Sequence, residues 1–548
     1  MPWAQVKASL GRLRRADAAL LPLYGIPFAV KDNIDVAGVP TTAACPAYAY
    51  TPDADAFVVE RLMAAGAIPI GKTNMDQFAA GLTGTRTPFG ACSSVVDARY
   101  VSGGSSSGSA VVVADGTVPF ALATDTAGSG RVPAAFNAIV GLKATLGTIG
   151  TRGVVPACRS LDCVSLMTTG AGDAARVLDV AAGPDPLDPY SRTGVARLPA
   201  SGASSARIAV PRPEQLTFCA DRFAAAAWQR ALSHARALGW ELVEIDLEPF
   251  AEAARLLYEG PWIAERYAAI GQFMADNRRR VDPIVRRVIM TGREYSAINA
   301  FAAAHRLAEL RLVTRAVWER ADALLLPTAP TIFTATEIAD EPIARNSLLG
   351  MYTNFVNLLD LCAVAVAGGT REDGLPFGVS LIAPAGADRA LLALAMHWRA
   401  EEATGEVSDD RDVVRLAVVG AHLSGEPLNH QLTGAGARLA ETLATAPGYR
   451  LYALPDTEPA RPGMVGGGPS HGPGIEVELW ELPAAAFGAL VAAVPPPLVI
   501  GTVALDDGRA VKCFLCEADA VVGAIDITRF GGWRAYRASL DLAEAGVG

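Results

Sequence analysis

The stretch of sequence that decides the fold runs from Ser102 to Thr145 and reads SGGSSSGSAVVVADGTVPFALATDTAGSGRVPAAFNAIVGLKAT. It carries two Ser/Gly turns, around Ser105 and around Ser129, with an apolar run between them. Gly and Ser in such numbers usually make flexible loops. Here apolar segments flank both turns and would bury them, and a buried hydroxyl needs a hydrogen-bond partner. The stretch therefore predicts two buried serine turns set between the elements of an α/β core.

The surrounding sequence continues this alternation. Residues 24–180 combine short apolar runs, Gly-rich turns and helical stretches, which predicts a sheet covered by helices. Between about 220 and 320, apolar residues repeat at intervals of three and four, which predicts a helical zone. Buried strands are expected within 321–330, 361–369 and 375–384, followed by a closing helix over 388–405.

The length of 548 residues, of which 51% are hydrophobic and 19% charged, favours a large enzyme of two domains, because single cores stop growing near roughly 250–300 residues. The acidic polar stretch EEATGEVSDDRD, residues 401–412, marks a boundary near residue 410. We therefore expect domains at 1–410 and 411–548. Strand-like runs at 413–423, 475–482, 498–508 and 510–518 predict a small, mostly β second domain, interrupted by a Gly/Pro loop from Pro459 to Gly474.

Charge and cysteine usage exclude several classes of function. A net charge of -10 opposes binding to phosphate backbones, and the strongest basic cluster, Arg278 to Arg280, is typical of a solvated helix end. Eight scattered cysteines form no disulfide framework, and the Cys513-x-x-Cys516 pair lacks the second pair that a zinc site needs. No apolar stretch or signal peptide indicates a membrane. We expect a soluble cytoplasmic protein with no nucleic-acid or membrane partner.

A phosphate-binding loop is suggested by Gly66 to Thr73, GAIPIGKT, which fits the pattern G-x-x-x-x-G-K-T. The context argues against it, because a helical run precedes Gly66 and the intervening residues AIPI are themselves strand-like. The run VVVAD after the serine turn is expected to be a helix rather than a strand that holds a nucleotide's metal ion. Nucleotide binding is therefore not expected.

A serine nucleophile needs a base, and lysine is the better candidate here. Of the six histidines, three fall on predicted helices and three in the C-terminal part, so a Ser-His-Asp triad would depend on a distant histidine, which sequence alone does not exclude. Lys31 ends the apolar run PFAVK, which would carry its amine into the interior. Burial there lowers the pKa of a lysine and permits a neutral amine base.

These segments, together with GIPFAVKDNIDV and GKTNMDQFAAG, resemble the amidase signature family over residues 24 to about 400. The resemblance implies a mixed β-sheet core covered by helices and a Ser-Ser-Lys triad that needs no metal or cofactor. By motif, Lys31 is the base, Ser105 the middle serine on a cis peptide bond, and Ser129 the nucleophile.

The same resemblance assigns the oxyanion hole to the backbone N–H groups of Thr126, Ala127, Gly128 and Ser129. Asp125 and Arg131 flank this turn as a supporting ion pair. The sequence departs from the family at two positions, where Ala127 and Ser107 replace expected glycines. Alanine keeps its backbone N–H, so we expect the oxyanion hole to be intact despite the change at residue 127.

The C-terminal segments LAVVGAHLSGEPLNHQL, GIEVELWELP and GGWRAYR resemble the C-terminal domain of allophanate hydrolases, over roughly 413–540. The resemblance implies that the first domain deaminates allophanate, the carboxylated urea made by urea carboxylase, and that the second acts in decarboxylating the product. It also implies urea carboxylase as a partner and a homodimer. The alternative is another amidase, acting on biuret, malonamate, an aliphatic amide or charged tRNA, with the C-terminal domain as a docking module.

A small anionic substrate needs a cation that binds a carboxylate, preferably arginine. Tyr258 and Arg266 lie eight residues apart in LLYEGPWIAERYAAI, which resembles the substrate-binding helix of allophanate hydrolases. On one helix that spacing is about 80° past two full turns, so both side chains would border one pocket. In the second domain His422, at a strand-to-turn junction, is the acid/base candidate, although a lone histidine is as often structural.

Overall fold

The computed structural model describes residues 6, 10, 11, 13, 18–193, 195, 205–402, 413–455, 457–467 and 474–545. The chain divides into two compact units, Met1–Ala403 and Thr404–Gly548, and each is described by itself. The predicted boundary near residue 410 lies outside the described residues. None of the described helices is long and apolar enough to cross a membrane.

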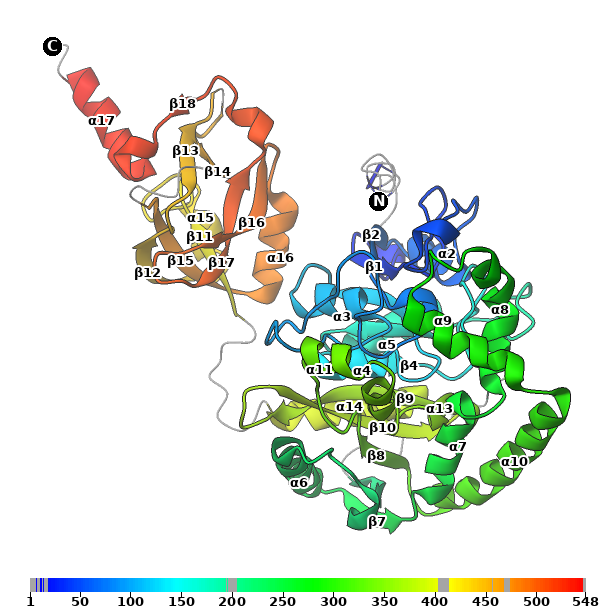
Figure 1. Ribbon diagram of the computed structural model, residues 1–548. Helices are drawn as coiled ribbons and strands as arrows, with labels where there is room; N and C mark the ends of the chain where they lie inside the picture. The colour runs from blue at the N-terminus through cyan, green and yellow to red at the C-terminus, as the bar shows by residue number, and fades with distance from the viewer. Residues whose placement is uncertain are drawn as a thin grey trace. The chain divides into compact units, whose positions relative to one another are not determined.

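The first unit is built on one mixed sheet of ten strands, in the order β2-β1-β3-β5-β4-β9-β10-β8-β6-β7 (Figure 1). The strands at each end of the sheet pair in parallel: β1 with β2 and β3 at one end, and β6 with β7 and β8 at the other. The pairs between β3 and β8 are antiparallel. The strands are β1 Pro27–Lys31, β2 Ile68–Thr73, β3 Phe120–Thr124, β4 Val140–Lys143, β5 Val164–Thr168, β6 Arg207–Pro211, β7 Glu241–Ile245, β8 Ala323–Pro327, β9 Leu361–Thr370 and β10 Pro376–Pro384. The predicted mixed sheet covered by helices is confirmed.

Helices cover both faces of this sheet. Those of the first unit are α2 Phe57–Ala64, α3 Ser107–Ala114, α4 Arg131–Phe136, α5 Ala171–Ala181, α6 Arg222–Ala237, α7 Glu248–Tyr258, α8 Trp262–Asp276, α9 Pro283–Met290, α10 Ala297–Arg315, α11 Ala335–Asp340, α12 Ala344–Leu349, α13 Phe355–Leu358 and α14 Asp388–Glu402. Short 3₁₀ turns join them: η1 Ala18–Leu20, η2 Pro46–Tyr48, η3 Gln77–Ala79, η5 Pro213–Gln215, η6 Thr291–Glu294 and η7 Ala316–Glu319.

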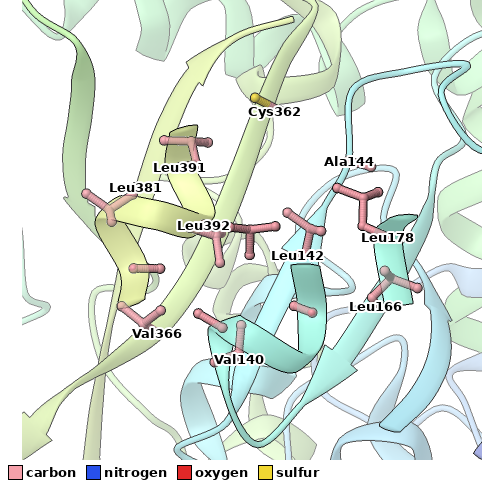
Figure 2. Close-up of a cluster of buried hydrophobic side chains, with 14 of the residues drawn as sticks. Val140, Leu142, Ala144, Leu166, Leu178, Cys362, Val366, Leu381, Leu391 and Leu392 are labelled. Carbon is pink, nitrogen blue, oxygen red and sulfur yellow. The ribbon is translucent and has the colours of Figure 1, made fainter. Parts of the chain in front are cut away.

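Alternate residues of the strands serve two different cores, as the period of two in a strand requires. On one face, Val140 and Leu142 of β4 pack with Leu178 of α5 and with Leu391 and Leu392 of α14 (Figure 2). On the other face β1 and β3 contribute small residues, which pack against α3 and α4. Larger residues of β7, β8 and β10 pack against α7, α10 and α13 in a separate cluster. Small side chains on this second face let the serine turns come close to the sheet.

The segment that resembles a phosphate-binding loop is a strand. Helix α2 ends just before Gly66, and β2 covers most of the supposed loop. The Lys72 side chain packs against the fold, where its amine donates to the carbonyl of Ile34 at 2.6 Å and pairs with Asp32 at 3.4 Å. These contacts agree with the prediction that this motif does not bind a nucleotide, because the Lys72 amine already binds the Ile34 carbonyl and Asp32.

The second unit is sheet-rich. A five-stranded sheet has the order β12-β15-β11-β17-β16, and a three-stranded sheet has the order β14-β13-β18. The strands are β11 Val413–Val418, β12 Arg438–Ala444, β13 Tyr449–Ala453, β14 Pro462–Gly466, β15 Glu476–Pro483, β16 Leu498–Ala504, β17 Ala510–Cys516 and β18 Ile525–Asp526. The helical elements are α15 Asn429–Thr433, α16 Ala484–Ala493, α17 Trp533–Ala545, η8 Ala518–Val521 and η9 Thr528–Phe530.

One expectation for this unit was wrong. The predicted loop from Pro459 to Gly474 contains strand β14, which pairs antiparallel with β13 and buries Met464 in the core. Pro462 and its glycine neighbours hid the strand in the sequence. They are tolerated because β14 is an edge strand with one partner. Cys513 and Cys516 are buried on β17, as expected for packing residues.

Candidate active site

The base and the first serine meet at the end of β1. Parallel pairing of β1 with β3 brings the carboxyl ends of both strands to one edge, where Lys31 ends β1 and Thr124 ends β3. Lys31 Nζ lies 2.8 Å from Ser105 Oγ and 2.7 Å from Thr124 Oγ1. Lys31 and Ser105 are fully buried. The predicted lysine–serine pair is therefore present as a buried hydrogen bond.

The electrostatics of Lys31 suit a base. Burial lowers its pKa from 10.5 to about 7, against the attraction of Asp76, Asp125 and Asp162, and the positive charge of Arg266 lowers it further. Near neutral pH a large fraction of the amine is thus uncharged and has a lone pair that can accept a proton.

The loop that carries Ser105 is held by Asp76. The peptide bond Gly104–Ser105 is cis, as the family resemblance implied. The backbone N–H of Asp76 donates to the Ser105 carbonyl at 3.0 Å. Its carboxylate accepts from the amides of Gly84 and Arg86, each at 2.9 Å. A side chain on Gly104 would meet this carboxylate at 2.1 Å, so only glycine fits before Ser105.

Ser129 lies in the tight turn between β3 and α4, and a buried ion pair fixes that turn. Arg131 Nε and Nη2 each donate to the Asp125 carboxylate at 2.8 Å, and both side chains are fully buried. Burial acts to raise the pKa of Asp125, but the charge and hydrogen bonds of Arg131 outweigh it and hold the pKa below its usual value. Asp125 also accepts from the amides of Gly128 at 2.7 Å and Gly130 at 3.1 Å.

A second segment closes over this turn. Thr353 Oγ1 donates to the Ala127 carbonyl at 2.7 Å, and Asn357 Nδ2 donates to the Asp125 carbonyl at 2.8 Å. Gly128 has φ of +129°, and a Cβ there would lie 2.3 Å from Thr353 Oγ1. The glycine at 128 is thus required, whereas Ala127, with its methyl packed in the core, takes the place of the other expected glycine.

The turn offers backbone donors to an oxyanion. The Gly128 amide already donates a hydrogen bond to Asp125 and so is not free for an oxyanion. Within the described part of the chain, the amides of Thr126, Ala127 and Ser129 donate to no protein acceptor. Such free amides beside a nucleophile can stabilise a developing negative charge.

A cavity of about 660 Å³ adjoins this region. Four arginines and one glutamate are the charged residues that line it: Arg86, Arg255, Arg266, Arg287 and Glu259. Met351, Tyr352 and Asn354 line it too, and they flank the Thr353 that touches the serine turn. The positive excess makes the cavity suited to a small anion.

Tyr258 and Arg266 both line this cavity, but they lie on two helices rather than one. Helix α7 ends at Tyr258 and α8 begins at Trp262, because Gly260 and Pro261 interrupt the run. The two side chains still meet across the corner. Arg266 Nη2 donates to Tyr258 Oη at 3.2 Å, and the guanidinium lies 5.4 Å from the ring centroid. Arg266 is only 2% exposed, so its charge is directed inward.

Several residues of the site were not identified from the sequence. Thr124 lies on the quoted stretch, but nothing in its surroundings singled it out. Thr353 and Asn357 are polar residues one helical turn apart in the apolar run YTNFVNLL, a pattern that could have indicated a buried polar face. Asp162 accepts from Thr126 Oγ1 at 2.6 Å, and burial raises its pKa.

In the second unit His422 follows β11 in a turn, as predicted. Its ring stacks on Phe514 with centroids 4.8 Å apart, and its Nε2 lies 3.0 Å from Gln431 Oε1. Burial lowers its pKa, and the nearby Arg461 and His430 act in the same direction. The turn is anchored through Ser424, whose amide donates to Glu478 and whose carbonyl accepts from Arg534. A neutral imidazole held this way can accept a proton or serve a structural role.

The described residues gather no cluster of three His, Cys, Asp or Glu side chains that could hold a metal ion. The chemistry available at the first site is that of a lysine-activated serine beside free backbone amides and a cationic cavity.

Comparisons with known proteins agree with this geometry. Residues 3–392 match the Amidase family model, and residues 414–538 match that of the allophanate hydrolase C-terminal domain. Urea amidolyase of Saccharomyces cerevisiae is 43% identical over 97% of this chain and 30% of its own length, so the chain spans less than a third of that relative. Urea amidolyase of Lachancea kluyveri is also 43% identical, again over 97% of this chain and 30% of the relative.

Among solved structures, Kluyveromyces lactis allophanate hydrolase is 41% identical, with a TM-score of 0.70 over 97% of this chain and 92% of that chain. These matches confirm the resemblance predicted from the serine turns. The candidate site lies within a family match that spans most of the sequence, and the chain therefore belongs to the amidase family of amide-hydrolysing enzymes.

Proposed function

We propose that this chain is an allophanate hydrolase, which releases ammonia and carbon dioxide from urea-1-carboxylate in urea degradation. The observation that carries the proposal is the combination of the buried Lys31–Ser105 pair with a cationic cavity that contains Arg266. The likeness to Kluyveromyces lactis allophanate hydrolase over nearly the whole of both chains supports it, as does the C-terminal domain match.

In the proposed mechanism, neutral Lys31 accepts the proton of Ser105 while Ser105 accepts that of Ser129. Ser129 Oγ attacks the terminal carbamoyl carbon, and the free amides of Thr126, Ala127 and Ser129 bind the oxyanion. The relay returns the proton to the departing nitrogen, which leaves as ammonia. Water then resolves the acyl-enzyme by the same relay and releases the dicarboxylated amine. The Ser105–Ser129 step of this relay is a prediction.

Arg266 and Tyr258 are proposed to hold the substrate carboxylate. A guanidinium can donate two parallel hydrogen bonds to a carboxylate. Tyr258 Oη accepts a hydrogen bond from Arg266 Nη2, and its own O–H can donate to the same carboxylate. Asp125 and Arg131 support the turn without touching the substrate.

For the second unit, with a domain boundary near residue 410, we propose that His422 acts in decarboxylating the released product. The pKa of His422, which burial lowers, and the anchored turn support this role. Replacing His422 with Ala should leave the first ammonia of each turnover unchanged and delay carbon dioxide release. Unchanged carbon dioxide release, with loss of a partner in pull-down experiments, would favour the docking alternative.

Urea carboxylase is proposed as the partner that supplies the substrate, and both enzymes are proposed to act in the cytoplasm.

A second copy of the chain is proposed as the dimer partner. Helix α10 exposes Ile298, Phe301 and Leu312, which are 80%, 68% and 72% exposed. Their spacing places them along one side of the helix, which supports a contact there. Replacing Ile298 and Phe301 with Glu should yield a monomer in analytical ultracentrifugation if this surface forms the dimer.

The test of substrate class is steady-state turnover of allophanate, biuret, malonamate and simple aliphatic amides. The proposal predicts the highest kcat/KM for allophanate. A preference for a neutral amide would instead favour the general amidase.

A further inference from the structure

Asp162 is a buried carboxylate shortly before β5, with 8% of its surface exposed. Its Oδ1 accepts from Thr126 Oγ1 at 2.6 Å and from the amide of Cys158 at 3.1 Å. Its Oδ2 accepts from the amide of Ala157 at 2.8 Å. A carboxylate is stable in the interior only when such donors replace water. All three donors belong to the chain itself, so Asp162 organises the residues around it.

The two hydrogen-bond donors of Thr126 differ in their partners. Its hydroxyl donates to Asp162, whereas its backbone N–H has no acceptor among the residues that the structure describes. This N–H shares a planar peptide unit with the Asp125 carbonyl, which accepts from Asn357 Nδ2 at 2.8 Å. Asn357 therefore holds the peptide unit itself, and Asp162 holds the side chain that follows it. The free N–H is left with little freedom to turn away from an oxyanion.

The loop that carries Asp162 has anchors of its own. The Leu161 carbonyl accepts from Asn357 Nδ2 at 2.7 Å. At the surface, Glu265 of α8 accepts from the amide and from the hydroxyl of Ser160, both at 2.7 Å. A carboxylate on a loop anchored at both places can fix the threonine hydroxyl without rearrangement. Donors that need no rearrangement are what an oxyanion hole requires.

The charge of Asp162 also acts on the base. Burial lowers the pKa of Lys31 to about 7. The charges of three carboxylates act in the opposite direction, those of Asp76, Asp125 and Asp162, and the charge of Arg266 adds to the lowering. Loss of the Asp162 charge would therefore lower the pKa of Lys31 further. This gives Asp162 a signature that a purely structural residue would lack.

We propose that Asp162 is a positioning residue of amide hydrolysis, which fixes the Thr126 side chain and so keeps the Thr126 N–H directed at the oxyanion formed when Ser129 attacks. The inference rests on the part of the proposed function that makes Ser129 the nucleophile, and it holds for any small amide as substrate. Asp162 touches no reacting atom in this role. Its effect is on the rate of the step that forms the oxyanion.

The test measures kcat and KM for allophanate, and for malonamate if the wild type does not hydrolyse allophanate. The variants are Thr126→Val, Thr126→Ser, Asp162→Asn and the double variant that combines Thr126→Val with Asp162→Asn. Asp388→Asn is the matched control, because Asp388 is also a buried carboxylate and accepts from the hydroxyl and the amide of Thr145, each at 2.6 Å. A pH profile is recorded for each protein.

Thr126→Val should lower kcat by about tenfold and change KM by less than about twofold, as expected for one misdirected oxyanion donor. Thr126→Ser should restore the rate, because it keeps the hydroxyl. The double variant should be no slower than the slower of its two parents, since both substitutions remove the same contact. Asp162→Asn should move the acidic limb of the pH profile to lower pH, whereas Thr126→Val and Asp388→Asn should leave the limb in place.

A wild-type kcat in Thr126→Val would overturn the inference while the proposed function stands. So would a double variant whose loss is the product of the two single losses, because the two residues would then act separately. An acidic limb that Asp162→Asn does not move would also overturn it. If the wild type hydrolyses malonamate but not allophanate, the proposed substrate fails and malonamate decides the inference. A wild type that hydrolyses neither amide overturns both.

Discussion

Thr124 Oγ1 lies 2.7 Å from Lys31 Nζ and 3.2 Å from Asn33 Nδ2, so one hydroxyl oxygen accepts N–H bonds from both neighbours. A neutral lysine amine has two N–H bonds and one lone pair. Because Thr124 takes up an N–H, it helps to turn the lone pair toward Ser105, 2.8 Å away. Thr124 therefore orients the base, in addition to ending the strand before the nucleophile.

Replacing Thr124 with Val keeps the shape of the side chain and removes this acceptor. We expect kcat/KM for allophanate to fall by about tenfold, which corresponds to the loss of one hydrogen bond that holds the base. The acidic limb of the pH profile should also move to lower pH, because a hydrogen bond that stabilises the charged amine is lost. Restoration of the rate by Thr124→Ser would show that the hydroxyl is responsible, and a wild-type rate in the Val variant would rule the role out.

The pH dependence of the reaction follows from Lys31. Its pKa is lowered to about 7, and only the uncharged amine can accept a proton. Below pH 7 the amine is protonated, so kcat/KM should fall about tenfold for each pH unit. Above pH 7 it should level off. A profile measured from pH 5 to 9 checks this, and an acidic limb centred near pH 10 would mean that the lysine is not desolvated.

The ion pair of Asp125 and Arg131 should carry a large share of local stability. Breaking a buried pair by removing one partner costs about 3–5 kcal/mol, because the other charge stays buried. Asp125→Asn should therefore lower the midpoint of urea unfolding markedly. Asp97→Asn is the control, since Asp97 pairs with Arg99 at the exposed surface and such pairs contribute little to stability. Equal midpoints for the two variants would contradict the assignment.

Arg266 affects both the substrate and the base. Arg266→Met should reduce kcat/KM for allophanate by about one to two orders of magnitude, as expected for lost hydrogen bonds to a charged group. It should also shift the acidic limb to higher pH, because the charge of Arg266 helps to lower the pKa of Lys31. Arg176→Met, at an exposed position on α5, is the control. A loss for neutral amides as large as that for allophanate would argue against carboxylate binding.

The sequence alone was enough to identify the site residues that are close together along the chain. Asp125 and Arg131 belong to one continuous stretch, and the ion pair expected between them is present. Ser105 and Ser129 lie on the same stretch, but their roles came from the family resemblance and the contact between them stays a prediction. Lys31 was found because an apolar strand precedes it and because the family resemblance gave it a role.

Residues that act across long distances in sequence could not be found this way. Thr353 and Asn357 reach the serine turn from 226 and 232 residues further along the chain. The break between α7 and α8 was also missed, because the apolar spacing continues through Gly260 and Pro261. Strand β14 was hidden by its own proline and glycines, which an edge position tolerates.

The most direct test of the account is ammonia release from allophanate by Ser129→Ala. Ser233→Ala is the matched control, since Ser233 is exposed on α6 and its hydroxyl donates to the Gln229 carbonyl of the same helix. Ammonia is measured for both variants and the wild type, with circular dichroism spectra to compare their folds. The account predicts background ammonia release for Ser129→Ala and the wild-type rate for Ser233→Ala. Ammonia release by Ser129→Ala at the wild-type rate would contradict it.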